Sequence, residues 1–318
     1  MEFHNSIIKA TAIAAGFSVL AGGAVAQEDY PTEPVTWVIP FGAGGGTDRL
    51  ARLLTAGGEA LVGQPVTVEN HSGAGATTGW LHVLDQPADG YTIFNASPTP
   101  LVTILTEDNP PVQPEDIAIV GYVGAFASIV VVREDDFADW DAFVAAAGER
   151  AITVGGTNST LLGAANTLSQ AGLDVIYVPY PSTGEAVTDF LGGHIDAVTT
   201  TESTAATIVP ENGIALINTS SLELAPEMDE ALGGDILMSR DLGYTGMASP
   251  RWVGVHPDTP EDIQLQVAEL VRQLAMDPEV QQAWADAGEP IQYMGMEEAQ
   301  ADYDALIPAL RNAVTLLE

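Results

Sequence analysis

Short, mostly apolar runs alternate along the chain with longer segments in which apolar residues recur three and four positions apart. The short runs predict strands, and the longer segments predict amphipathic helices. We expect strands at Val35–Ile39, Val66–Glu69, Thr92–Asn95, Ile117–Val123, Ile129–Val132, Ile152–Val154, Val175–Val178, Ala197–Thr200, Ala215–Asn218 and Trp252–Val255. We expect helices at Asp48–Leu61, Thr77–Leu84, Trp140–Ala147, Thr160–Gln170, Thr183–Leu191, Pro260–Met276, Pro278–Ala287 and Met296–Leu317.

This alternation predicts an α/β protein, and the chain length predicts two lobes. We place the first lobe at residues 27–125 and 246–318 and the second at residues 126–245. The chain would therefore cross between the lobes twice.

The N-terminal segment has the pattern of an export signal. Lys9 precedes an apolar run, and Ala24-Val25-Ala26 then forms a small-residue cleavage site. The apolar run is too short to span a bilayer as a helix. We expect cleavage near Ala26 and a periplasmic protein, and the absence of cysteine excludes both a lipid anchor on cysteine and disulfides.

The charge of the chain excludes several classes of partner. The sequence holds 44 acidic and 9 Lys or Arg residues, a formal net charge of −35. Nucleic acids and anionic membranes are bound by basic surfaces, so neither is expected as a partner. We interpret the acidity as an adaptation for solubility in a salty medium. Any bound anion must be held by local dipoles against the field of the whole protein.

A glycine-rich loop follows the first predicted strand. It reads Phe41-Gly42-Ala43-Gly44-Gly45-Gly46-Thr47-Asp48 and runs directly into a helix. The lysine of a phosphate-binding P-loop is missing, and Thr47 stands where a dinucleotide-binding loop needs its third glycine. The N–H groups at such a helix start can hold an anion. A tight turn without a ligand is the alternative.

Three further loops follow predicted strands and precede helices. Their ligand-binding candidates are Ser72, Gly73 and Ala74; Thr157, Asn158, Ser159 and Thr160; and Tyr180, Ser182 and Thr183. In open α/β sheets, ligands bind at the carboxyl ends of the strands. The alternative for the hydroxyl side chains is helix capping alone. Ser97 and Glu202 complete the candidate set.

The first glycine-rich loop also supplies candidate ligand-binding residues. We expect ligand contacts from Phe41, Gly42, Ala43, Gly44, Gly45 and Thr47. Asp48 is included, although a negative first turn that stabilises the helix is the simpler explanation of this residue.

Enzyme chemistry finds little support in the sequence. The chain has no cysteine nucleophile, no G-x-S-x-G motif and no H-E-x-x-H motif. His71, His82, His194 and His256 show no metal-binding spacing. We therefore expect no catalytic residues, no metal and no cofactor, and keep a periplasmic hydrolase as the alternative from another class.

Taken together, these segments resemble the substrate-binding proteins of tripartite tricarboxylate transporters, the family that includes the Bug receptors. The resemblance rests on the order and spacing of these motifs: Ile39-Pro40-Phe41 through Thr47-Asp48 with Ala51-Arg52, Glu69-Asn70 with Gly73-Ala74-Gly75 and Gly79, Asp89-Gly90-Tyr91-Thr92, Val178-Pro179-Tyr180, Asp189 through Asp196, and Trp252-Val253-Gly254-Val255.

The resemblance implies a type II, Venus-flytrap binding protein with two strands crossing at the hinge. It implies a carboxylate-bearing solute held between the lobes by backbone N–H groups and waters, membrane transporter subunits as partners, and a monomer. A receptor that feeds a sensor kinase is the alternative. The segments Thr157–Thr160 and Tyr180–Gly184 depart from the usual family pattern, so the solute is not specified.

Overall fold

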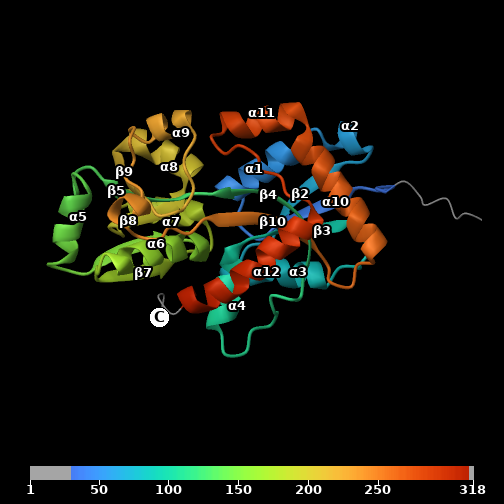
Figure 1. The fold of residues 1–318 in the computed structure, drawn as a ribbon, viewed down its shortest axis with the longest axis horizontal. Coiled ribbons are helices and arrows are strands. Elements are labelled where there is room, and N and C mark those ends of the chain that lie inside the picture. The colour runs from blue at the N-terminus through green and yellow to red at the C-terminus, as the bar shows by residue number, and fades with distance from the viewer. Residues whose placement is uncertain (1–29, 315–318) are drawn as a thin grey trace, which may run out of the picture.

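The computed structural model describes residues 30–314 (Figure 1). The predicted signal peptide lies outside the described residues, as does the end of the last predicted helix. Among residues 30–314, no helix is both long enough and apolar enough to cross a bilayer.

The first lobe is built on a mixed sheet in the order β2-β1-β3-β10-β4. β1 pairs in parallel with β2 and β3, whereas β10 runs antiparallel to β3 and β4. The strands are β1 (Val35–Ile39), β2 (Val66–Asn70), β3 (Thr92–Ala96), β4 (Ala118–Phe126) and β10 (Ser249–Val255). Apolar side chains cover both faces of this sheet, which explains why its strands read as continuous apolar runs.

The second lobe repeats this plan in the order β7-β6-β8-β5-β9. β6 is parallel to β7 and β8, and β5 is antiparallel to β8 and β9. The strands are β5 (Ser128–Arg133), β6 (Ile152–Gly156), β7 (Val175–Pro179), β8 (Ala197–Thr201) and β9 (Gly213–Asn218). Two apolar clusters again cover the two faces.

Helices connect the strands and cover both sheets. Those of the first lobe are α1 (Gly46–Thr55), α2 (Gly58–Val62), α3 (Thr77–Leu84), α4 (Pro98–Thr106), α10 (Glu261–Met276), α11 (Pro278–Asp286) and α12 (Met296–Ala313). Those of the second are α5 (Trp140–Ala147), α6 (Asn158–Gln170), α7 (Thr183–Leu191), α8 (Glu202–Ile208) and α9 (Pro226–Ala231). Short 3₁₀ turns lie at Ala74–Ala76, Val209–Glu211 and Ser239–Leu242.

The two lobes are joined by strands that lie side by side in the middle of the molecule, β4 and β10 (Figure 1). The chain leaves the first sheet at Phe126, and Ser128 already begins the first strand of the second sheet. It returns after β9 through a segment that leads into β10. These positions agree with a two-lobed fold, while the domain limits given above stay a prediction.

The sequence pattern predicted the fold class correctly, and most elements start and end close to their expected positions. One predicted helix, Asp48–Leu61, is wrong: Gly57 and Gly58 interrupt it, and the chain forms α1 and α2 instead. Glycine inside a helix costs stability, so a pair of them favours a break. The helices α4, α8 and α9 were not predicted, because α4 and α9 begin at prolines and α8 and α9 are short.

Candidate functional site

A narrow cavity lies between the lobes, with about 20 Å³ of space free for a water-sized molecule. It is lined from the first lobe by the glycine loop and the start of α1, and from the second by the starts of α6, α7 and α8. The lining residues are Phe41, Gly42, Gly45, Gly46, Thr47, Asp48, Phe126, Thr157, Ser159, Thr160, Ser182, Thr183 and Thr201.

The first wall of the cavity is the N-terminus of α1. The N–H of Arg49 makes a helical bond to the carbonyl of Gly45 at 3.0 Å, so the N–H groups of Gly46, Thr47 and Asp48 precede the intrahelical ladder. Such groups carry the positive end of the helix dipole. This wall can therefore bind an anion without a cationic side chain.

Asp48 introduces a carboxylate into the same wall, but three neighbours hold it. Its oxygens accept hydrogen bonds from the N–H of Gly44 at 2.9 Å, from Asn70 Nδ2 at 2.9 Å and from Arg52 at 2.8 and 3.1 Å. Burial alone would raise the pKa of Asp48; the hydrogen bonds, led by Arg52, outweigh it and lower the pKa. The carboxylate is thus ionised, paired and part of the loop's own structure.

The second wall consists of three helix starts. Thr157 precedes α6, Ser182 caps α7 by accepting from the N–H of Glu185 at 3.3 Å, and Thr201 caps α8 by accepting from the N–H of Thr204 at 3.3 Å. Capping explains these hydroxyls locally. Their positions around the cavity also make them available to a ligand.

The cavity therefore combines several positive helix ends with a lining whose one charged side chain, Asp48, is paired with Arg52. Among its described lining residues there is no Lys, Arg or His, and the one carboxylate is already paired. Backbone donors from both lobes and seven hydroxyl side chains line the cavity. Helix N-termini of this kind bind anionic groups such as carboxylate, phosphate or sulfate.

The lobes are in close contact around the cavity. Ser159 Oγ accepts a hydrogen bond from Thr99 Oγ1 at 2.7 Å, and Asn158 Nδ2 donates to Thr103 Oγ1 at 2.7 Å. These bonds join α6 of the second lobe to α4 of the first. The described arrangement is consequently a closed one.

Two glycines permit this approach. A Cβ atom on Gly46 would lie 3.0 Å from Thr201 Oγ1, and one on Gly42 would lie 3.4 Å from Ser182 Cβ. At position 46 in particular, a side chain would be in too close contact with Thr201.

Ten of the candidate residues predicted from the sequence line the cavity together. They are Phe41, Gly42, Gly45, Thr47, Asp48, Thr157, Ser159, Thr160, Ser182 and Thr183. Ala43, Gly44, Ser72, Gly73, Ala74, Ser97, Asn158, Tyr180 and Glu202 lie outside its lining. The structure gives other contacts to Asn158, which bonds Thr103, and Tyr180, whose hydroxyl donates to Asp189 at 2.7 Å. Ligand contact by any of these residues stays a prediction.

Glu202 is buried next to the crossing strands. It accepts a hydrogen bond from the N–H of Ala127 at 2.9 Å. Arg251 and Glu289, an ion pair, are buried in the same region, and the Arg251 guanidinium lies 4.7 Å over the ring of Phe126. Burial, and then the charge of Glu289, raise the pKa of Glu202 well above its usual value.

Three lining residues were missed by the sequence analysis. Gly46 and Thr201 lie directly beside residues that were named, so their omission reflects uncertainty about the exact loop positions. Phe126 ends β4, and only the path of the chain between the lobes brings it to the cavity. No local pattern in the sequence could have identified it.

This architecture, with two mixed five-stranded sheets, crossing strands and a cavity between the lobes, defines a periplasmic binding protein fold. The family model of the tripartite tricarboxylate transporter family receptor, TctC, matches residues 50–304. The chain belongs to this TctC, or Bug-type, receptor family. It is thus a transporter substrate-binding receptor and not an enzyme.

Individual relatives agree with this assignment. A UPF0065 protein from Agrobacterium vitis is 28% identical over 284 residues, covering 85% of this chain and 80% of that protein. The MatC structure from Rhodopseudomonas palustris, with bound malate, has a TM-score of 0.78 at 20% identity and covers 90% of this chain and all of that one (100%). An R. palustris structure with adipate has a TM-score of 0.81 at 20% identity and covers 91% and 98%.

Proposed function

We propose that this receptor is exported to the periplasm, captures a small carboxylate solute in the cavity between its lobes and delivers it to the membrane subunits of a tripartite transporter. The observation that carries the proposal is the meeting of helix N-termini from both lobes around a cavity whose described lining has no cationic side chain. The family supports delivery to a transporter, and the malate and adipate of the two R. palustris structures support a carboxylate.

The distribution of the donors favours a solute with two carboxylates. The start of α1 lies on one wall, and the starts of α6 and α7 lie on the other. A carboxylate at each end of a short chain would complete hydrogen bonds to both lobes, and this would stabilise closure. A monocarboxylate would satisfy one wall only.

A thermal-shift screen of the purified protein tests the binding step. Because a ligand that binds only the folded state raises the apparent stability, dicarboxylates such as malate and adipate should raise Tm more than acetate or butyrate of equal concentration. Amide analogues of the same length serve as neutral controls. Binding by amides and acids alike would contradict an anion site.

Delivery is tested separately by uptake. Cells that lack the receptor should lose uptake of the radiolabelled solute found in the screen, and the restored gene should recover it. A cavity variant that no longer binds in vitro should fail to restore uptake. Uptake at normal rate without the receptor would contradict the delivery step and leave the binding result intact.

A further inference from the structure

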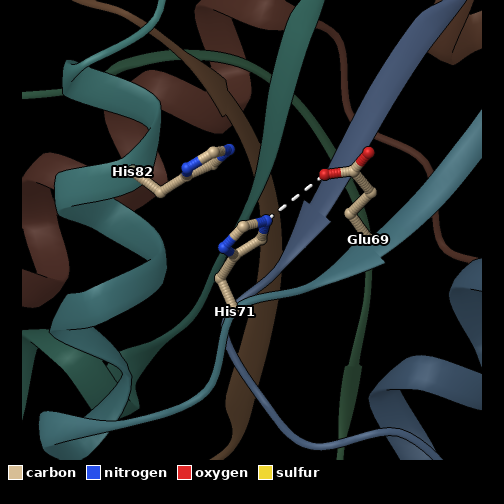
Figure 2. Close-up of side chains that lie close together, drawn as sticks. All are labelled: Glu69, His71 and His82. Carbon is tan, nitrogen blue, oxygen red and sulfur yellow. Dashed lines mark hydrogen bonds and ion pairs between the residues drawn. The ribbon is translucent and has the colours of Figure 1, made fainter.

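Outside the cavity, Glu69, His71 and His82 gather at the edge of the first sheet. Glu69 lies on β2, His71 directly follows that strand, and His82 lies on α3 (Figure 2). One ligand atom from each residue lies within 4.8 Å of those of the other two. The interval from residue 71 to residue 82 has none of the short spacings typical of metal motifs, which is why the sequence indicated no site.

The fold explains how these distant residues meet. The N–H of His71 bonds to the carbonyl of Ile39 at 2.9 Å, so the edge strand remains extended there, and Glu69 and His71, two positions apart, lie on one side of it. Gly79 lets α3 approach closely: a Cβ atom at this position would lie 2.8 Å from Pro40 Cβ and 3.1 Å from the His71 carbonyl. His82, three positions later on the same helix face, is thereby placed over His71.

The two histidine rings lie face to face, with centroids 3.7 Å apart and an interplanar angle of 14°. His71 Nε2 lies 3.3 Å from Glu69 Oε2, which is long for a charged hydrogen bond. It matches the separation of about 3.3 Å between two ligand atoms in tetrahedral zinc, given bonds of about 2.0–2.1 Å. The arrangement of this pair therefore suits a shared ion.

The cluster is accessible from solvent. The side chains of Glu69 and His71 are 53% and 29% exposed, which leaves the cluster open to solvent.

We propose that Glu69, His71 and His82 form a binding site for a divalent transition-metal ion such as zinc, with water completing the coordination. Two imidazole nitrogens and one carboxylate suit zinc, nickel or copper far better than magnesium or calcium, which prefer oxygen ligands. Imidazole binds a metal in its ring plane, so one ring must turn from the parallel arrangement. The final torsion of histidine has a broad energy minimum, and this adjustment costs little.

A bound ion would connect β2, an edge strand, to α3. The site is independent of the solute cavity, because none of its three residues belongs to the cavity lining. Its consequence would be stability: an ion that binds only the folded protein stabilises it by an amount that grows with the logarithm of the ion concentration over Kd, and Tm rises accordingly.

Calorimetric titration with zinc tests the proposal. The protein is purified without a polyhistidine tag. We expect one zinc ion per chain, a rise of Tm with zinc but not with equimolar magnesium, and at least tenfold weaker zinc binding in His82→Gln and in Glu69→Gln. The exposed His194, which lies outside the cluster, supplies the matched control His194→Gln, which should bind zinc like the wild type. Since Glu69 is exposed, Glu69→Gln tests the site even if His82→Gln folds poorly.

Equal zinc affinity in the wild type, His82→Gln and Glu69→Gln would overturn the proposal, because zinc would then be bound by the acidic surface in general. An equal Tm rise with magnesium would do the same. Failure of the site would leave the proposed solute binding untouched, since the two sites share no residue.

Discussion

The N–H of Gly44 donates a hydrogen bond of 2.9 Å to the carboxylate of Asp48, so the glycine loop is closed by an acidic side chain of its own helix. Arg52, one turn further along α1, donates two hydrogen bonds to the same carboxylate. The pair supplies a negative charge and its compensation beside a cavity that we propose for anions. This relationship leads to a direct test of the electrostatics of the site.

Arg52→Gln should weaken carboxylate binding by about tenfold. The substitution leaves Asp48 ionised without its cation beside the anion, and a like charge at such a distance costs roughly 1–2 kcal/mol when partly shielded. The double variant Asp48→Asn/Arg52→Gln removes both charges and should recover most of the affinity. Calorimetric titration with the best dicarboxylate from the screen measures both.

Arg272→Gln is the matched control for this experiment. Arg272 also pairs with a carboxylate of its own helix, Glu269, and its side chain is 48% exposed compared with 49% for Arg52. It lies outside the cavity lining, so its loss should leave affinity unchanged. Equal weakening by both substitutions would show that net charge, and not the Asp48 pair, determines the effect.

Gly46→Ala should weaken solute binding by about fivefold. Its methyl group would lie 3.0 Å from Thr201 Oγ1 of the opposite lobe, and a closed state that must relax by a few tenths of an ångström loses about 1 kcal/mol. Titration of the same dicarboxylate measures the change. Gly57→Ala is the control, because its methyl group would meet only Leu61 Cδ1, at 3.7 Å. Unchanged affinity in Gly46→Ala would mean that solute binding does not require this closed contact.

Much of the fold could be predicted because it depends on local pattern. Strands buried on both faces read as apolar runs, and Trp140–Ala147 and Thr183–Leu191 begin and end as expected. The break at Gly57 was missed because the leucines on either side keep a helical spacing. α4 was missed because Pro98 and Pro100 read as loop residues, although proline fits the first turn of a helix well.

The site was harder to predict, since it depends on how the lobes close. The glycine loop lines the cavity from Phe41 to Asp48 apart from Ala43 and Gly44, whereas the loop with Ser72, Gly73 and Ala74 lies outside the lining. Glu202 also follows a strand end, but its carboxylate accepts a hydrogen bond from the N–H of Ala127, at the crossing between the lobes. Such a difference in direction is set by tertiary packing. The meeting of His71 with His82 likewise depends on the close approach of α3.

Asp196→Asn should lower the stability of the protein at neutral pH by about 2 kcal/mol. Burial would raise the pKa of Asp196, but hydrogen bonds from Arg150 and Thr153 lower it to about 2. A carboxyl group whose pKa is lowered by folding stabilises the folded state at pH values above its pKa in the unfolded chain, which is near 4. This stabilisation is lost as the pH falls through the folded pKa of about 2. Urea unfolding at pH 7 and pH 3 should therefore show a large difference from the wild type at pH 7 and a smaller one at pH 3.

Glu269→Gln is the comparison for that experiment. The pKa of Glu269 is also lowered to about 2, chiefly by the hydrogen bond from Arg272. Both side chains of that pair are about half exposed, and solvent screens such surface pairs strongly. We expect a much smaller loss of stability than in Asp196→Asn. A loss of similar size would show that the shift in pKa, regardless of burial, determines how much each carboxylate contributes to the free energy of unfolding.

Glu202→Gln should stabilise the protein at pH 8 and have little effect at pH 4. The carboxyl is buried beside Glu289, and burial followed by that charge raises its pKa well above the usual value. A raised pKa means that the folded state favours the protonated acid, so the wild type loses stability as the pH rises through the folded pKa. Glutamine resembles the protonated acid at every pH and can still accept the hydrogen bond from Ala127.

Thermal unfolding at pH 8 and pH 4 measures the difference in stability between Glu202→Gln and the wild type, with the exposed Glu223→Gln as the control. Equal destabilisation of Glu202→Gln at both pH values would instead mean that the folded protein holds Glu202 as an anion, compensated by Arg251 at the crossing of the two lobes.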